Sequence, residues 1–211
     1  SCREAASAFS ICAWNTDMYG VNTQHPAAEA WYNSLYQLFA SWDVDYVKVD
    51  DIAWNKLEED HYPQAEVELI AKAISHNQRP MVLSLSPGPA VLNYGGHMSR
   101  FANLWRITDD LWDEWELVAR CIDRCQAWAP FVGVNASWPD ADMLPLGRLR
   151  CRPNPQGEAC RLSQDEQTTL FRLWCLFRSP LMMGGDLQQL DDWTLSLLTN
   201  KALLKLNQTP H

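Results

Sequence analysis

Apolar residues recur at two different spacings along the chain, and the two spacings alternate. Over 26–42 they lie on one face of a helix, as Trp31 and Leu35 illustrate with a four-residue interval. A short β-branched run at 44–49 follows and ends at the acidic pair 50–51. This pattern predicts a helix and then a strand whose carboxyl end carries polar groups.

The same order repeats about four more times along the chain. Further helices are predicted at 64–77, 111–125, 164–177 and 191–206, and further strands at 81–85, 104–107, 131–134 and 181–183. Strands that alternate with helices are typical of a parallel sheet with crossover helices. No glycine-rich phosphate-binding motif follows any of these strands, so the sequence does not support a nucleotide-binding sheet.

These repeated units predict the α/β class, and within it a (β/α)8 TIM barrel. Functional groups of such barrels lie at the carboxyl ends of the strands. The candidate strands end near four carboxylates: Asp50, Asp110, Asp142 and Asp186. A complete barrel takes about 250 residues, whereas this chain has 211. Residues 1–211 are therefore expected to form one partial barrel domain with about the last five βα units.

Charge and composition exclude several classes of partner. The net charge is −9 and no basic stripe is present, so neither nucleic acid nor a membrane is expected as a partner. The eleven tryptophans predict a packed interior, with some ring faces available for stacking on sugars. The seven cysteines fit no zinc spacing. Cys151 and Cys160 are the best disulfide candidates, and free thiols are the equal alternative.

Lys48 and Asp50 are the first candidate pair for chemistry. The two-residue period of a strand places both side chains on the same face. The lysine favours an ionised Asp50, which is the form that a carboxylate nucleophile needs. A buried structural ion pair is the alternative. Asp51 points to the other face and is expected to cap a helix or to support the site.

Arg106 and Asp110 are the second candidate pair. The guanidinium can hold a carboxylate or a sugar hydroxyl. The apolar neighbours Trp105 and Trp112 favour a protonated Asp110, which can act as a general acid. Alternatively, the segment before residue 111 caps the next helix and Arg106 is an ordinary salt-bridge partner. Two carboxylates of different protonation state on separate strands suit glycoside hydrolysis.

A third acidic cluster, residues 138–142, either lines a pocket or shapes a loop, and the loop role is favoured for Asp140. A hydrolase that uses the three acidic clusters to bind Mg²⁺ is an alternative function. Lys48 and Arg106 argue against it, because they already balance the charge that a cation would neutralise. The five histidines stand in no metal-ligand spacing.

Four segments together resemble glycoside hydrolase family 27, the family of α-galactosidases and α-N-acetylgalactosaminidases. They are Trp-Asp-Val-Asp-Tyr-Val-Lys-Val-Asp (42–50), Ala-Asn-Leu-Trp-Arg-Ile-Thr-Asp-Asp (102–110), Trp-Pro-Asp-Ala-Asp-Met-Leu (138–144) and Arg-Ser-Pro-Leu-Met-Met-Gly-Gly-Asp-Leu (178–187). The resemblance covers residues 12–208 and implies a (β/α)8 barrel that lacks its first three βα units here. Without those units, residues 1–211 alone are expected to be inactive.

The resemblance also implies roles for individual residues. Asp50 matches the nucleophile of the family and Asp110 its general acid/base, while Lys48 and Arg106 match residues that bind the sugar. The implied mechanism is a double displacement with retention, without a metal or an organic cofactor. Further candidates for substrate binding are Trp14, Asp17, Ser86, Trp138 and Asp142.

The implied activity is the release of terminal α-galactose from an oligosaccharide or glycoconjugate. Ser86 stands where α-galactosidases carry a glutamate, so α-N-acetylgalactosaminidase and β-L-arabinopyranosidase remain alternatives within the family. An inactive carbohydrate-binding fragment is the alternative of another class. Cys12 resembles a loop cysteine of the family, but Ile52 replaces its partner, so no disulfide is expected. The resemblance favours a secreted, periplasmic or lysosomal location and leaves a homo-oligomer open.

Overall fold

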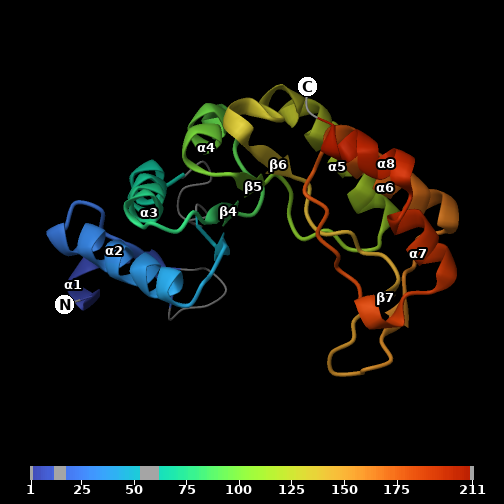
Figure 1. Cartoon of the computed structure of the whole chain (residues 1–211), viewed down its shortest axis with the longest axis horizontal. Helices are drawn as coiled ribbons and strands as arrows, with labels where there is room; N and C mark the ends of the chain where they lie inside the picture. The colour runs from blue at the N-terminus through green and yellow to red at the C-terminus, as the bar shows by residue number, and fades with distance from the viewer. Residues whose placement is uncertain (1, 12–17, 53–61, 210–211) are drawn as a thin grey trace. The chain divides into compact units, whose positions relative to one another are not determined.

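The computed structural model describes residues 2–11, 18–52 and 62–209 (Figure 1). The chain divides into two compact units. The first comprises Ser1–Trp105 with Asn135–Ser137, and the second comprises Arg106–Val134 with Trp138–His211. No helix in the described residues has both the length and the apolar character that crossing a membrane requires.

The first unit is built on parallel strands with helices between them. Its elements are α1 (Cys2–Ala5), β1 (Ala6–Ile11), β2 (Tyr19–Val21), α2 (Pro26–Ser41), β3 (Tyr46–Asp50), α3 (Gln64–His76), β4 (Val82–Ser86), η1 (Leu92–Tyr94), α4 (Gly95–Phe101) and β5 (Leu104–Arg106), whose last residue belongs to the second unit. β4 is the parallel neighbour of both β3 and β5. β1 and β2 form a separate antiparallel pair.

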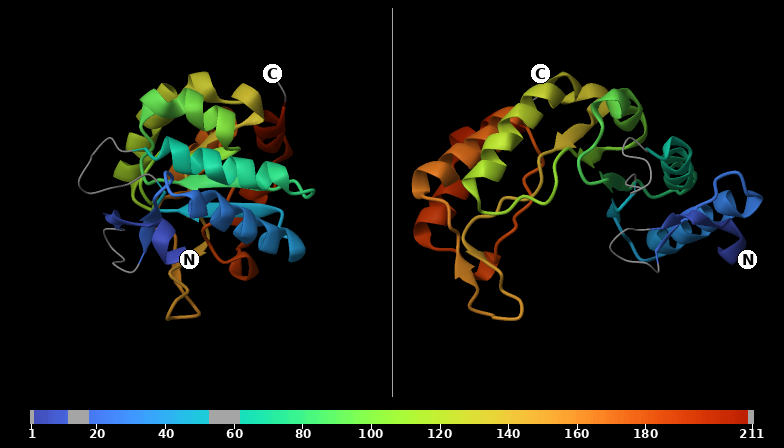
Figure 2. Two further views of the ribbon diagram at one scale, coloured as in Figure 1. Left: turned by 90° about the vertical axis from the view of Figure 1, so that its left-hand side faces the viewer. Right: turned by 180° about the vertical axis from the view of Figure 1, so that it is seen from behind.

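Helices α2 and α3 lie side by side in the first unit (Figure 2). Lys72 and Glu29 form an ion pair of 2.7 Å between the two helices, and the Tyr32 hydroxyl donates a hydrogen bond to Glu66. Beneath them, Ile70 is among the buried apolar residues of α3.

The predicted apolar face is confirmed for α3 but is wrong for α2. The buried face of α2 carries Tyr32 and Tyr36, whereas Trp31 and Leu38 of the predicted stripe are 40% and 44% exposed. The buried positions of α2 thus lie one residue away from the predicted stripe, because the tyrosines face α3.

The second unit consists mainly of helices around a tryptophan-rich core. Its elements are α5 (Trp115–Trp128), η2 (Ala129–Phe131), the first residue of η3 (Val134–Ala136), β6 (Trp138–Asp140), β7 (Arg148–Leu149), β8 (Glu158–Ala159), α6 (Gln164–Phe177), η4 (Leu187–Gln189), α7 (Asp192–Leu198) and α8 (Lys201–Gln208). Trp128 and Trp174 are fully buried. The Ile107 amide donates to the Asp140 carbonyl at 2.9 Å, which joins β6 to the end of β5.

Most of the predicted elements are confirmed, with helices at 26–41, 64–76 and 164–177. The prediction of a strand at 131–134 is wrong, because short 3-10 turns occupy this region and the strand begins at Trp138. The apolar run that suggested a strand ends at Asn135, whose positive φ of 53° is incompatible with a β-strand.

The prediction of a buried strand at 181–183 is also wrong. Met183 makes an isolated parallel bridge with Leu144, and Met182 is 40% exposed. The predicted helix at 191–206 is two helices, α7 and α8. The side chain of Asn200 caps the second one by accepting from two backbone amides, which starts a new helix there.

The cysteines of the 151–160 loop are free thiols. β7 and β8 pair antiparallel, and the Cys160 amide donates to the Gly147 carbonyl at 2.9 Å. This register sets Cys160 opposite Gly147 instead of Cys151, so the predicted disulfide is not formed. The prediction for Cys12 lies outside the described residues.

Candidate active site

Lys48 and Asp50 share one face of β3, as the two-residue period predicted. Exposure alternates along the strand: Tyr46, Lys48 and Asp50 are exposed, while Val47 and Val49 are half-buried. Neither Lys48 nor Asp50 makes a side-chain hydrogen bond or ion pair with another residue in the described ranges. The alternative of a buried structural ion pair is therefore wrong for this part of the chain.

Ser86 is brought to the same sheet edge as Asp50 by the parallel pairing of β3 and β4. The two residues are Cα partners in the register, and the Ser86 carbonyl accepts a hydrogen bond of 3.0 Å from the Asp51 amide. Ser86 itself is buried. The end of β3 is thus positioned by backbone hydrogen bonds to the neighbouring strand.

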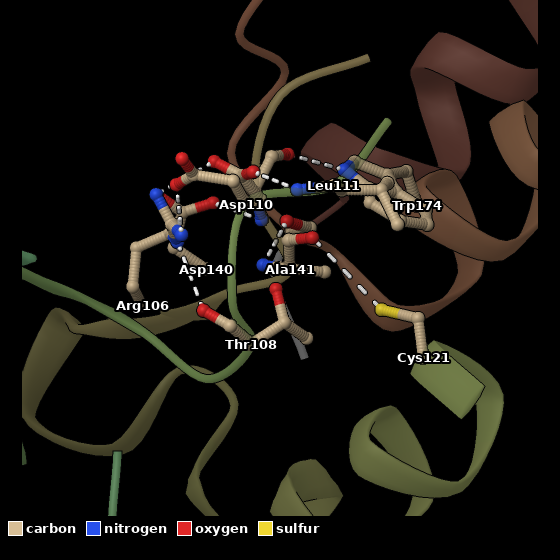
Figure 3. Close-up of polar contacts among 10 residues, drawn as sticks. Arg106, Thr108, Asp110, Leu111, Cys121, Asp140, Ala141 and Trp174 are labelled. Carbon is tan, nitrogen blue, oxygen red and sulfur yellow. Dashed lines mark hydrogen bonds and ion pairs between the residues drawn. The ribbon is translucent and has the colours of Figure 1, made fainter. Parts of the chain in front are cut away.

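Arg106 is the centre of a polar network at the end of β5 (Figure 3). It is only 5% exposed, and its three donor groups point in three directions. Nη2 pairs with Asp110 at 2.8 Å, Nη1 pairs with Asp142 at 3.1 Å, and Nε donates to the Thr108 carbonyl at 3.1 Å. A fork with all its arms engaged has one orientation, so Arg106 fixes the loop that carries Asp110.

Asp110 lies in a different environment from the one that the sequence suggested. Its side chain is 77% exposed, whereas Trp105 is fully buried. This exposure excludes an apolar pocket around the carboxyl within the described part of the chain. The suggestion that this segment caps the next helix is also wrong, because α5 begins at Trp115 and its N-cap is Glu114. Asp110 is instead held by its ion pair with Arg106.

Asp142 is the buried partner of this network. Its Oδ2 accepts a 2.7 Å hydrogen bond from the Leu111 amide, and its carbonyl accepts one of 2.8 Å from the Trp174 indole. Burial raises the pKa of Asp142, and the Leu111 amide and Arg106 offset only part of that rise. Its own amide donates to Asp140 Oδ1 at 2.9 Å, which agrees with the loop-shaping role expected for Asp140.

Trp138 is placed less favourably than the candidates above. Trp138 is the first residue of β6 and therefore lies at the amino end of the strand. Its ring lies 5.9 Å from the guanidinium carbon of Arg178. Barrel enzymes place substrate contacts at the opposite end. Trp14 and Asp17 lie outside the described residues.

A second buried carboxylate, Asp113, was missed by the sequence reasoning. Its side chain is fully buried and accepts hydrogen bonds from Arg150 at 2.5 and 3.2 Å and from the Arg161 amide at 2.8 Å. Burial raises its pKa, but these hydrogen bonds outweigh it and leave the pKa below the usual value. Asp113 ties the loop after Asp110 to the β7–β8 hairpin.

The described residues contain no group of three His, Cys, Asp or Glu side chains placed as metal ligands. In the second unit, the Arg106 guanidinium pairs with both Asp110 and Asp142. The cationic partner of these two carboxylates is therefore a side chain of the protein itself. Asp50 and Ser86 belong to the first unit and this network to the second.

Comparisons with known proteins point to one family. The profile of the family described as alpha galactosidase A matches residues 15–209. The chain is 30% identical to alpha-galactosidase 2 of Arabidopsis thaliana, over 81% of this chain and 39% of that protein. It is also 30% identical to alpha-N-acetylgalactosaminidase of Gallus gallus, over 82% of this chain and 41% of that protein.

A solved structure is more similar still. The β-L-arabinopyranosidase of family 27 from Geobacillus stearothermophilus is 49% identical and matches with a TM-score of 0.91, over 98% of this chain and 47% of that one. The chain thus spans less than half the length of these relatives. Its parallel strands and helices are part of an incomplete (β/α)8 barrel, as predicted. Because the family profile covers nearly the whole sequence, the chain belongs to the alpha galactosidase A family, glycoside hydrolase family 27.

Proposed function

We propose that the full-length protein carrying this chain is a retaining exo-glycosidase that removes terminal α-galactosyl residues. The observation that carries the proposal is the ion pair of 2.8 Å between Arg106 and Asp110 at the end of β5. It holds an exposed carboxylate at the strand end, where barrel enzymes perform their chemistry. Residues 1–211 are then part of a single catalytic barrel domain.

In this mechanism the two carboxylates have different tasks. Asp50 attacks the anomeric carbon while Asp110 gives a proton to the leaving oxygen, and a covalent glycosyl-aspartate forms. Asp110 then takes a proton from water, which attacks the same carbon and releases the sugar with its original configuration. Lys48, on the same face of β3 as Asp50, is suited to donate hydrogen bonds to a sugar hydroxyl.

Arg106 serves this mechanism by holding the acid/base in place. Because Asp142 and the Thr108 carbonyl occupy its other donors, the guanidinium does not turn when Asp110 loses or gains its proton. Preorganised positioning of this kind lowers the barrier without rearrangement during the reaction. Asp142, which is buried, contributes by orienting Arg106 instead of by touching the sugar.

β-L-Arabinopyranosides are a second candidate substrate, because the β-L-arabinopyranosidase is 49% identical to this chain and the two relatives quoted above are 30% identical. β-L-Arabinopyranose has the ring configuration of α-D-galactose without the hydroxymethyl group. Both sugars therefore present the same face to Asp50 and Asp110. Nitrophenyl α-galactoside, α-N-acetylgalactosaminide and β-L-arabinopyranoside, assayed with the full-length protein, separate these substrates.

Two measurements test the mechanism. NMR of the first product is expected to show the anomer of the substrate, and an inverted anomer would exclude a double displacement. A 2-deoxy-2-fluoro glycosyl fluoride is expected to label the protein, and mass spectrometry should locate the label on Asp50. Labelling of another residue would refute the assigned nucleophile. Loss of activity on chelation would favour the metal-dependent hydrolase, and sugar binding without turnover would favour the carbohydrate-binding alternative.

A further inference from the structure

Trp112 has a large exposed ring that the mechanism above does not use. Exposure alternates along this loop: Asp110 and Trp112 are exposed, whereas Leu111 and Asp113 are buried. Asp110 and Trp112 are therefore both exposed side chains of one short loop, two residues apart.

Two buried anchors hold this loop in position. Leu111 is buried, and its amide donates to Asp142 at 2.7 Å. Asp113 is buried and accepts two hydrogen bonds from the Arg150 guanidinium. Because Trp112 lies between these anchors, its backbone is fixed on both sides, and the place of its ring is set by the fold.

Arg150 also braces the indole directly. Its guanidinium carbon lies 5.3 Å from the centroid of the Trp112 ring, within the range of a cation–π contact. Glu158 of β8 lies 3.7 Å from the same guanidinium, so the β7–β8 hairpin supports the contact. The Trp112 residue nevertheless stays 38% exposed. The result is an indole that is immobilised by Arg150 and still open to a ligand.

Trp112 follows Asp110, the general acid of the proposed mechanism, by only two residues, so the indole belongs to the same loop as that acid. A general acid protonates the bond between the terminal sugar and its leaving group, so the leaving group departs on the side of that acid. An indole face is apolar and binds the apolar face of a flat ring. We propose that Trp112 is a leaving-group platform, which Arg150 and Asp113 hold in place and which favours substrates whose leaving group is a second pyranose ring. This inference rests on the proposed glycosidase function.

The test compares two substrates with the same terminal galactose in the full-length protein. The first is an α-galactosyl disaccharide, and the second is α-galactosyl fluoride, whose leaving group has no ring. Trp112→Ala is expected to lower kcat/KM for the disaccharide about tenfold and to change the value for the fluoride by less than about twofold. Arg150→Lys, which loses the planar fork, should lower the disaccharide value about threefold with the same dependence on the leaving group.

Trp31 on α2 provides the matched control, because it is also exposed, at 40%, and lies outside this loop. Trp31→Ala should leave kcat/KM unchanged for both substrates. An equal loss for disaccharide and fluoride in Trp112→Ala would show a merely structural role and overturn the inference, as would no loss for either. A wild-type protein that cleaves neither substrate would refute the proposed function itself, and the inference with it.

Discussion

The carboxyl ends of β5 and β3 each present a carboxylate for chemistry, but they hold it by different means. At the end of β5, Asp110 is ion-paired to Arg106, which is itself fixed by the buried Asp142. At the end of β3, Asp50 has no side-chain partner among the described residues. Its place is set by the backbone, through the parallel pairing that sets it opposite Ser86.

This difference matches the different tasks that we propose for the two acids. An acid/base changes its charge twice in each cycle and must keep its orientation, which a fixed cation provides. A nucleophile must be free to form a bond, so a carboxylate without side-chain partners is suitable. It follows that substitutions at the end of β3 should change activity alone, whereas those at the end of β5 should change stability as well.

Removal of the proposed nucleophile, Asp50, gives the largest expected effect. Asp50→Gly should lower kcat/KM by about 10⁴-fold or more, because the covalent route is lost. Added azide should restore turnover and give a product of the opposite anomer. Asp50→Asn, which adds no glycine to the strand, should keep the thermal midpoint of the wild type, since the side chain is exposed and has no partner among the described residues. Asp123→Asn, at an exposed carboxylate of α5, is the control for both measurements. A clear drop in the midpoint of Asp50→Asn would break the comparison.

Removal of the proposed acid/base, Asp110, should have a smaller effect that depends on the substrate. Asp110→Asn should lower kcat/KM about 10²- to 10⁴-fold for a disaccharide, which needs protonation of its leaving oxygen. Glycosyl fluoride needs no such help and should lose much less in the first step. Stability should fall by less than about 1 kcal/mol, because Asp110 forms an exposed ion pair. Asp109→Asn is the neighbouring control, and equal losses for both substrates would contradict the assigned role.

Replacement of Arg106, the cation at the centre of the network, should lower mainly the stability of the protein. Arg106→Met leaves Asp142 buried without its ion partner, so the free energy of unfolding should fall by about 3–5 kcal/mol in urea denaturation. The double variant with Asp142→Asn should recover part of this loss, because no buried charge then remains. A loss no larger than that of Asp110→Asn would mean that the network does not support the fold.

The sequence revealed those features that depend on neighbouring residues. Helices α2, α3 and α6 follow from apolar residues at three- and four-residue intervals. The Arg106–Asp110 pair follows from a spacing of four residues within one short motif. In both cases the partners are close along the chain, so the local pattern contains the information.

Contacts between distant segments were not visible in this way. Asp113 and Arg150 are 37 residues apart, and Leu111 and Asp142 are 31 apart, so no local pattern links them. The exposed environment of Asp110 was missed for the same reason. Trp105 is only five residues away in the sequence and was expected to shield the carboxyl group, but its side chain is buried in the core. Periodicity predicts that a segment is helical, whereas tertiary packing decides which face is buried, as the exposed Trp31 of α2 shows, and which polar groups pair.

The two buried carboxylates of the second unit sharpen the comparison further, because their pKa values move in opposite directions from the usual 3.8. Burial raises the pKa of Asp142, with only partial compensation from Leu111 and Arg106. For Asp113, burial is outweighed by the hydrogen bonds of Arg150 and Arg161, which lower the pKa. The same kind of residue therefore has opposite effects on the pH dependence of stability.

The signs follow from proton linkage. A lowered carboxyl pKa stabilises the fold above the unfolded value, and that stability is lost as the pH falls through the folded pKa. A raised pKa favours the fold below the unfolded value, and this contribution is lost as the pH rises through the folded pKa. Asp113→Asn should therefore flatten the loss of stability in acid, and Asp142→Asn should remove a loss that occurs as the pH rises from about 4.

Urea denaturation of the wild type and both variants, from about pH 3 to about pH 7, measures these slopes. For each variant, the change in the free energy of unfolding between these pH values should be smaller than the loss expected for Arg106→Met, since asparagine keeps the shape of the aspartate side chain. Asp165→Asn, on the exposed first turn of α6, is the control and should leave the slope unchanged. Parallel pH profiles for Asp113→Asn and Asp142→Asn would show that the two carboxylates do not differ as their contacts require. Buried charge would then no longer distinguish the network at the end of β5 from the partner-free carboxylate at the end of β3.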